Sequence, residues 1–197
     1  VAGQQIVQEY IGCVFEGGGN GIGGVSGITA LGCIFNNVGG DGINFSSSSA
    51  SLILVGNTFY SCGSDGIEIA SVPGAASFHI IANNIFSESS GYGLNQSTGT
   101  NSDILDRGYN LFHSNTSGSE NGFGDSPSFG DQTDTSSPFV NAVGGDFSLT
   151  VDSNANRNGA PVIFEGGTLG NLDIGAIQRQ TRTNTFYDSN LYDTVVN

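Results

Sequence analysis

The stretch NNIFSESSGYGL (residues 83–94) has four further versions along the chain, each with a phenylalanine followed six to ten residues later by glycine and a hydrophobic residue. The others are GCVFEGGGNGI (12–22), GCIFNNVGGDGI (32–43), GNTFYSCGSDGI (56–67) and YNLFHSNTSGSENGF (109–123). Successive phenylalanines lie 20, 24, 27 and 26 residues apart. A period of this length, built from short apolar runs without helical periodicity, indicates a solenoid of stacked coils.

Aligning the five versions on the phenylalanine reveals columns of equivalent residues. Two positions before it stand Cys13, Cys33, Asn57, Asn84 and Asn110. We expect the asparagines to pass amide hydrogen bonds from coil to coil. Because Asn tolerates the left-handed backbone region, this column is also the expected bend between two sheets. The residue directly before the phenylalanine forms a second, largely apolar column, and the sequence does not decide which column faces inward.

A column of glycines follows each phenylalanine, at Gly21, Gly42, Gly66, Gly93 and Gly122. We expect a positive φ at these glycines, which would re-aim the chain. A strand with alternating polarity then begins, as in GINFS (42–46) and GIEIA (66–70). Another strand precedes the next phenylalanine, as in SLILVGNTF (51–59). Three short strands in every coil predict a parallel β-helix.

The coils GNTF…DGIEI and NNIF…GYGL resemble those of right-handed parallel β-helix proteins, the superfamily that includes pectate lyases, polygalacturonases and phage tailspikes. SSPFVNAVGGDFSLT (136–150) and LDIGAIQRQ (172–180) resemble the closing segment of secreted bacterial surface β-helix proteins, which carries PxFV…GDFxL and ends in DIGAxQ. The piece between them, DSNANRNGAPVI, departs from the usual GSPAIDAG. The resemblance covers residues 6–178 and implies a fold rather than an activity.

These observations predict an all-β protein with one domain over residues 1–178. About five coils form a right-handed parallel β-helix, interrupted by a loop insertion at 113–137. A closing segment follows at 138–178, and residues 179–197 form a tail. The chain contains no Met, which predicts a processed form or part of something longer.

Charge excludes several classes of partner. The net charge is −14, and the four cations are all arginines, so no basic patch exists to bind nucleic acid. An anionic membrane surface is disfavoured for the same reason, and no apolar run is long enough to insert into a membrane. We expect an extracellular or cell-surface location.

Candidate catalytic residues are few. Asp41 and Asp65 share one coil position and should stack about 5 Å apart. Such a pair suits retaining glycoside hydrolysis or a shared metal; the alternative is that Asp-Gly is a turn dipeptide. Arg107, next to Asp106, is the candidate base of a lyase, and a surface ion pair is its alternative. His79 and His113 have no nearby nucleophile pattern and are interpreted as surface or loop residues.

The sequence gives weaker indications of metal binding and of thiol chemistry than of carboxylate chemistry. The insertion 113–137 carries four candidate calcium ligands, Glu120, Asp125, Asp131 and Asp134. The alternative is a solvated surface loop, and no other cofactor is predicted. Cys13 and Cys33 should lie in adjacent coils, either as buried thiols or as a disulfide.

The tail is too apolar to remain without a partner. Its apolar residues are Phe186, Tyr187, Leu191, Tyr192, Val195 and Val196. We expect it to dock as an added strand, on its own β-helix or on a neighbouring subunit. A β-helix exposes unpaired strands at both ends, so the tail and the bare N-terminal coil together predict head-to-tail self-association or a larger surface assembly.

The functional interpretation is a non-catalytic extracellular structural or adhesive protein that assembles into a filament or surface appendage. The alternative is a polysaccharide lyase or glycoside hydrolase that acts on acidic glycans. The scarcity of basic residues in the coils favours the structural interpretation.

Overall fold

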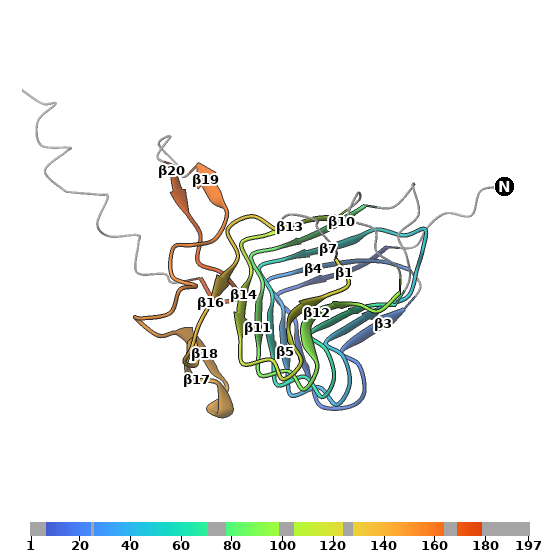
Figure 1. Cartoon of the computed structure of the whole chain (residues 1–197), viewed down its shortest axis with the longest axis horizontal. Coiled ribbons are helices and arrows are strands. Elements are labelled where there is room, and N and C mark those ends of the chain that lie inside the picture. The colour runs from blue at the N-terminus through green and yellow to red at the C-terminus, as the bar shows by residue number, and fades with distance from the viewer. Residues whose placement is uncertain are drawn as a thin grey trace, which may run out of the picture.

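The computed structural model describes residues 7–24, 26–70, 78–98, 105–123, 128–163 and 169–178. The six apolar tail residues and Asp125 therefore lie outside the described residues. Within these ranges the chain forms a parallel β-solenoid followed by a segment that covers one of its sides (Figure 1).

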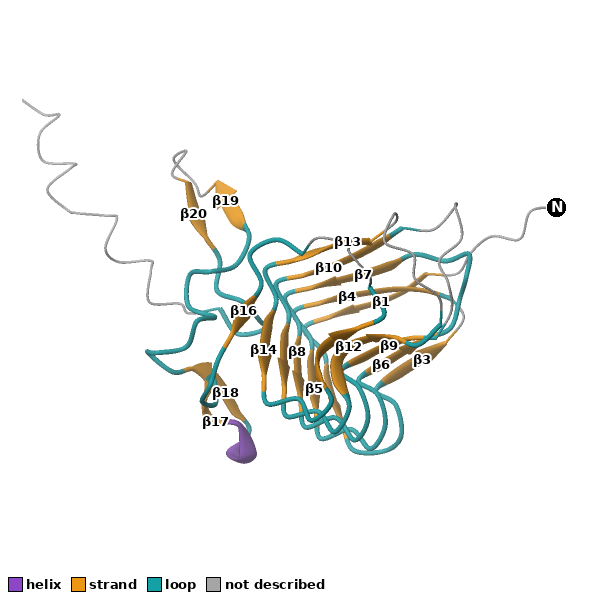
Figure 2. Cartoon of the chain, in the orientation of Figure 1, coloured by secondary structure: helices purple, strands orange, loops and turns teal. Residues whose placement is uncertain are grey.

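Every coil contributes one strand to each of three parallel sheets, as Figure 2 shows. Sheet A contains β1 (Val7–Ile11), β4 (Gly27–Leu31), β7 (Leu52–Val55), β10 (His79–Ala82) and β13 (Leu105–Gly108). Sheet B contains β2 (Val14–Glu16), β5 (Ile34–Asn36), β8 (Thr58–Tyr60), β11 (Ile85–Ser87), β14 (Leu111–His113) and β16 (Gln132–Thr133). Sheet C contains β3 (Ile22–Gly24), β6 (Ile43–Phe45), β9 (Ile67–Ile69), β12 (Tyr92–Gln96) and β15 (Gly118–Asn121). The predicted fold class is confirmed.

The repeated phenylalanine is the centre of the core. From Phe15 to Phe112 the five rings stack in register, with centroids 4.7, 4.5, 5.0 and 5.2 Å apart. The residue before each phenylalanine points to the outside of sheet B, where Ile85 and Leu111 belong to a separate apolar cluster. The orientation that the sequence left open is thereby settled, with the phenylalanine inward.

Two columns of left-handed residues bound the strands of sheet B. They stand three positions before and two positions after the phenylalanine, for example at Asn83 (φ 58°) and Glu88 (φ 59°) around Phe86. The bend therefore falls one residue before the asparagine column, so the predicted bend at the asparagines is wrong.

The asparagines form the predicted hydrogen-bond ladder, with no exposed surface. Asn84 Oδ1 accepts hydrogen bonds from the backbone N–H (2.9 Å) and the amide Nδ2 (3.0 Å) of Asn57. Its Nδ2 donates to the carbonyl of Leu54 (3.0 Å) and to Asn110 Oδ1 (3.1 Å). Asp131 ends the ladder, because its Oδ1 accepts from the N–H of Asn110 at 2.8 Å. These bonds tie each coil to the next inside the core.

The glycine column is required for space, which corrects the expected backbone reason. Only Gly122 in this column has a positive φ, at 85°. A Cβ on Gly66 would lie 2.5 Å from the carbonyl oxygen of Gly93 and 2.6 Å from Cδ1 of Phe86. The glycines therefore let the phenylalanine of the next coil lie flat against the backbone.

The closing segment covers the outer face of sheet B. It contains β17 (Phe139–Asn141), η1 (Ala142–Gly144), β18 (Asp146–Leu149), β19 (Pro161–Ile163) and β20 (Leu169–Asn171), with β17–β18 and β19–β20 as antiparallel pairs. The rings of Phe139 and Phe147 meet Tyr60 edge-on at 6.0 and 5.6 Å. In the DIGA motif, the N–H of Ala176 donates to Thr58 Oγ1 at 3.0 Å.

The stretch 113–137, expected to be a loop insertion, includes two strands of the solenoid. β15 pairs with β12 in sheet C, and β16 pairs with β14 in sheet B. The coil therefore continues through this polar stretch, where the apolar pattern used to recognise strands is missing.

Candidate functional site: a carboxyl cluster on sheet C

The structure uses the two predicted aspartates to join coils. Asp41 Oδ1 accepts a hydrogen bond from the N–H of Asp65 (3.0 Å), and Asp65 Oδ1 accepts one from the N–H of Tyr92 (2.6 Å). Asn20 does the same for the N–H of Asp41 at 2.9 Å. The column before the glycines is thus a second polar ladder, and its two carboxyl side chains are 8% and 6% exposed.

Glu68 joins this cluster, which the sequence analysis missed. It lies in β9 on the outer face of sheet C, in the register column of Asn44, Asn95 and Asn121. Asn95 Nδ2 donates to both Asp65 Oδ2 (2.8 Å) and Glu68 Oε2 (2.7 Å), and Ser97 Oγ donates to Glu68 Oε1. Glu68 stands two residues after Gly66, so alternation along the strand predicts that its side chain points outward.

Partial burial raises the pKa of Glu68 to about 6, and a hydrogen bond to Asp65 and its charge act in the same direction. The hydrogen bond from Ser97 opposes this shift. Glu68 can therefore hold a proton in mildly acidic solution, as a general acid must. Both oxygens of Asp65 accept hydrogen bonds from the chain itself, and little of this side chain is accessible to a substrate. The geometry therefore fits a structural role better than a catalytic one.

Arg107 lies inside the solenoid rather than on its surface. It is in register with Ile81 and Leu54, which are core residues. Its guanidinium donates to Glu120 through Nε and Nη2, both at 3.0 Å, and lies 4.7 Å from the ring centroid of Phe123. The buried guanidinium and the partly buried Glu120 close the core at the last coil, so the surface ion pair is wrong, whereas a role of Arg107 as a lyase base stays a prediction.

The described calcium candidates have separate structural partners. Glu120 pairs with Arg107, and Asp131 ends the asparagine ladder, where burial raises its pKa. Asp134 accepts hydrogen bonds from the N–H of Asn154 (3.0 Å) and from Ser153 Oγ (2.8 Å). No group of three or more His, Cys, Asp or Glu side chains in the described ranges could hold a metal ion. With Asp125 outside those ranges, calcium binding stays a prediction.

Both histidines are buried, contrary to their interpretation as surface or loop residues. His79 is 1% exposed in β10, where its Nδ1 accepts from the N–H of Leu52 at 3.2 Å and its ring meets Phe45 edge-on. Burial lowers the pKa of His79. His113 lies beneath the closing segment, with its Nδ1 hydrogen-bonded to Ser87 Oγ at 2.9 Å.

The three cysteines are free thiols, so the disulfide alternative for Cys13 and Cys33 is not formed, and Cys13 is half-buried rather than buried. Cys33 and Cys62 are buried, and burial raises the pKa of Cys62 to about 12. A thiol of this kind behaves as a small apolar side chain rather than as a nucleophile.

The stacked coils, inward phenylalanines and internal ladders define the class of parallel β-solenoids. The chain matches the family described as "Right handed beta helix region" over residues 7–125, and it belongs to this family. Neither the curated proteins nor the solved structures contain a match to it. Among the described residues, no helix is long and apolar enough to cross a membrane.

Proposed function

We propose that this chain is a non-catalytic structural or adhesive protein of the cell exterior, which associates with a further β-coil of a neighbouring molecule through its N-terminal coil. The observation that carries the proposal is the difference between the two ends of the solenoid. A solenoid end exposes unpaired backbone groups and core side chains, and both favour pairing with another β-structure.

The N-terminal coil has the features of a pairing edge. In the described part of the chain, β1, β2 and β3 each pair with one neighbour only. The inward side chains of Tyr10 and Phe15 are only partly buried, and Val7, Ile11 and Val14 on the outer faces of the same coil are 59%, 65% and 65% exposed. At the other end, the inward positions carry the Arg107–Glu120 ion pair in place of aliphatic residues. An added coil would bury apolar surface at the first end and charges at the second, so we expect association at the first.

The experiment is to measure the mass of the native protein by light scattering over a range of concentrations, and to image it by electron microscopy. We expect concentration-dependent assemblies that a Val14→Lys variant reduces at least tenfold. The matched control is Val143→Lys, which places the same charge at a 90% exposed valine of the closing segment and should leave assembly unchanged. A monomer at every concentration, or equal effects of the two variants, would contradict the proposal.

A second candidate is glycan chemistry at the carboxyl cluster, and the observation that favours it is the raised pKa of Glu68 beside Asp65. Glu68 would donate a proton to the glycosidic oxygen, with Asp65 as the second carboxylate. The test is release of reducing or unsaturated sugar from acidic glycans by the native protein, compared with Glu68→Gln. Activity that the variant loses would support this candidate, and no release from any acidic glycan would reject it.

A further inference from the structure

The three outer faces of the solenoid differ in chemistry. The closing segment covers sheet B, and sheet C carries polar residues. Sheet A presents two rows of mostly aliphatic side chains in register, which are half-buried except for the exposed Ile11. The rows are Ile11, Leu31, Val55 and Ala82, and Thr29, Ile53 and Ile80, the second row being bordered in register by Glu9 and Asp106. A contiguous apolar face of this kind indicates a binding surface.

The closing segment ends at the border of this face. The N–H of Gly175 donates to the carbonyl of Asn83 at 2.7 Å, and its own carbonyl oxygen lies 3.6 Å from where a Cβ of Gly56 would stand. Gly56 and Asn83 are the bend residues that directly follow Val55 and Ala82. The described region ends at residue 178, three residues after this contact at the border of sheet A.

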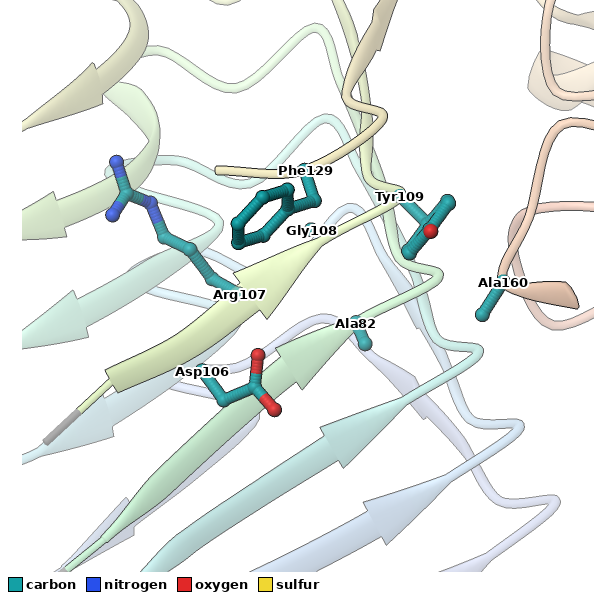
Figure 3. A pocket seen from close by; sticks show the side chains of 7 residues that line it. All are labelled: Ala82, Asp106, Arg107, Gly108, Tyr109, Phe129 and Ala160. Carbon is teal, nitrogen blue, oxygen red and sulfur yellow. The ribbon is translucent and has the colours of Figure 1, made fainter. Parts of the chain in front are cut away.

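A pocket of about 260 Å³ lies at the same border. Figure 3 shows Phe129 over Gly108, with Ala160 of the closing segment across from Tyr109 and Ala82, while the Arg107 side chain points away. Phe129 is 63% exposed. These mostly apolar walls fit an aromatic side chain better than a polar ligand.

We propose that residues 180–197 of the same chain lie across the outer face of sheet A and place an aromatic side chain, Phe186 or Tyr187, in this pocket. The nineteen residues after Gln178 can span roughly 60 Å when extended, whereas five parallel strands are only about 20 Å across. Arg182 lies between the border and the aromatic pair in sequence, and the exposed carboxylate of Asp106 at the pocket complements its charge. The tail is then the apolar cover of sheet A, as the closing segment is of sheet B.

This inference goes beyond the proposed function, because it uses the tail within one molecule and leaves the N-terminal coil free to associate. The test is hydrogen–deuterium exchange of the full chain, followed by mass spectrometry of its peptides. We expect backbone amides between residues 185 and 196 to exchange at least tenfold more slowly than in a synthetic peptide of the same sequence. This protection should not depend on protein concentration.

Two variants locate the docking site. Ile53→Asp places a charge in the middle of the apolar face and should return the tail amides to the exchange rate of the peptide. Val151→Asp, at an 83% exposed valine of the closing segment, should leave them protected. If Ile53→Asp does not fold, Ile53→Thr replaces it and should lower the protection at least twofold. Unprotected tail amides in the native chain would overturn the proposal, as would protection that rises with concentration or that the Ile53 variants do not change.

Discussion

Replacing Asn84 by alanine tests whether the asparagine ladder holds the coils together. The substitution removes four hydrogen bonds, two accepted by Oδ1 and two donated by Nδ2, all without exposed surface. The N–H of Asn57 and the carbonyl of Leu54 lose these partners inside the core. At about 1 kcal/mol net for each bond, with a further ~1 kcal/mol for the unpaired buried N–H, the expected loss is about 5 kcal/mol.

The assay is urea unfolding followed by circular dichroism, with the slope of the transition compared between variants, because solenoids can unfold in parts. Asn121→Ala is the control. This asparagine is exposed and donates one hydrogen bond to Asn95 Oδ1 at 2.9 Å, which water can replace. We expect its loss to be under ~0.5 kcal/mol. A cost below ~1 kcal/mol for Asn84→Ala, or equal costs for the two variants, would refute the argument from buried pairing.

Three further outcomes are expected, each read from the free energy of unfolding. Gly66→Ala should cost about 1–3 kcal/mol because its Cβ has no room, whereas Gly19→Ala, with no atom within 4 Å, should cost far less; similar costs would contradict the steric reason. Arg107→Ala should cost about 3–5 kcal/mol, because it leaves Glu120 unpaired. The double variant Arg107→Met with Glu120→Leu should recover most of this stability. A double variant as unstable as Arg107→Ala would contradict the prediction. Burial lowers the pKa of His79 in the folded state, so its contribution to stability is present above pH 6.5 and is lost as the pH falls through the lowered folded pKa. His79→Leu should therefore flatten this part of the plot of unfolding free energy against pH. An unchanged plot would mean that another group causes the pH dependence.

The columns themselves could be predicted because each coil places an equivalent residue in an equivalent environment. An amide both donates and accepts, so stacked asparagines predict a ladder before any contact is seen. The phenylalanine spacing predicts a column of equivalent residues, but not that its rings face inward and stack. The reason for the glycines could not be predicted, since a missing Cβ serves either a positive φ or a close approach. Only the distance from Gly66 to Phe86 decides between the two.

Among the misplaced residues, Arg107 and His79 show how a bend hides the inward face. Alternation along a strand cannot be carried across a left-handed residue, because the bend at Tyr109 or Asn83 resets which side chains face the core. The sequence nevertheless indicates the inward position, because inward residues of this strand stand at a constant distance before the phenylalanine. Arg107 stands five residues before its phenylalanine, as the core residues Leu54 and Ile81 do. The carboxyl cluster was harder, because Glu68 and Asn95 meet Asp65 only through the register of sheet C.

The closing segment could be recognised from its motif but not placed. It has no repeat register, and its contacts join residues far apart in sequence, such as Ala176 and Thr58. Nothing local in DIGA specifies the outer face of sheet B. The buried Ile174 and the close approach of Gly175 to Ile85 supply the reason for two of its residues, but only once the face is known.

The end of the stack is encoded in three columns at once. The phenylalanine column stops, because Thr133 is in register with Phe112. The asparagine ladder ends in Asp131, which can accept the last N–H but, when ionised, has no proton to pass on. The inward aliphatic columns end in Arg107 and Glu120. At the first coil Phe15 and Ile22 keep the residue types of the core, whereas Gln8 replaces an aliphatic residue and Cys13 replaces an asparagine, so the changes there introduce no charge. A further coil would meet the Arg107–Glu120 ion pair and Asp131 at one end and uncharged, mostly apolar columns at the other, so we expect any extension of the stack at its N-terminal side.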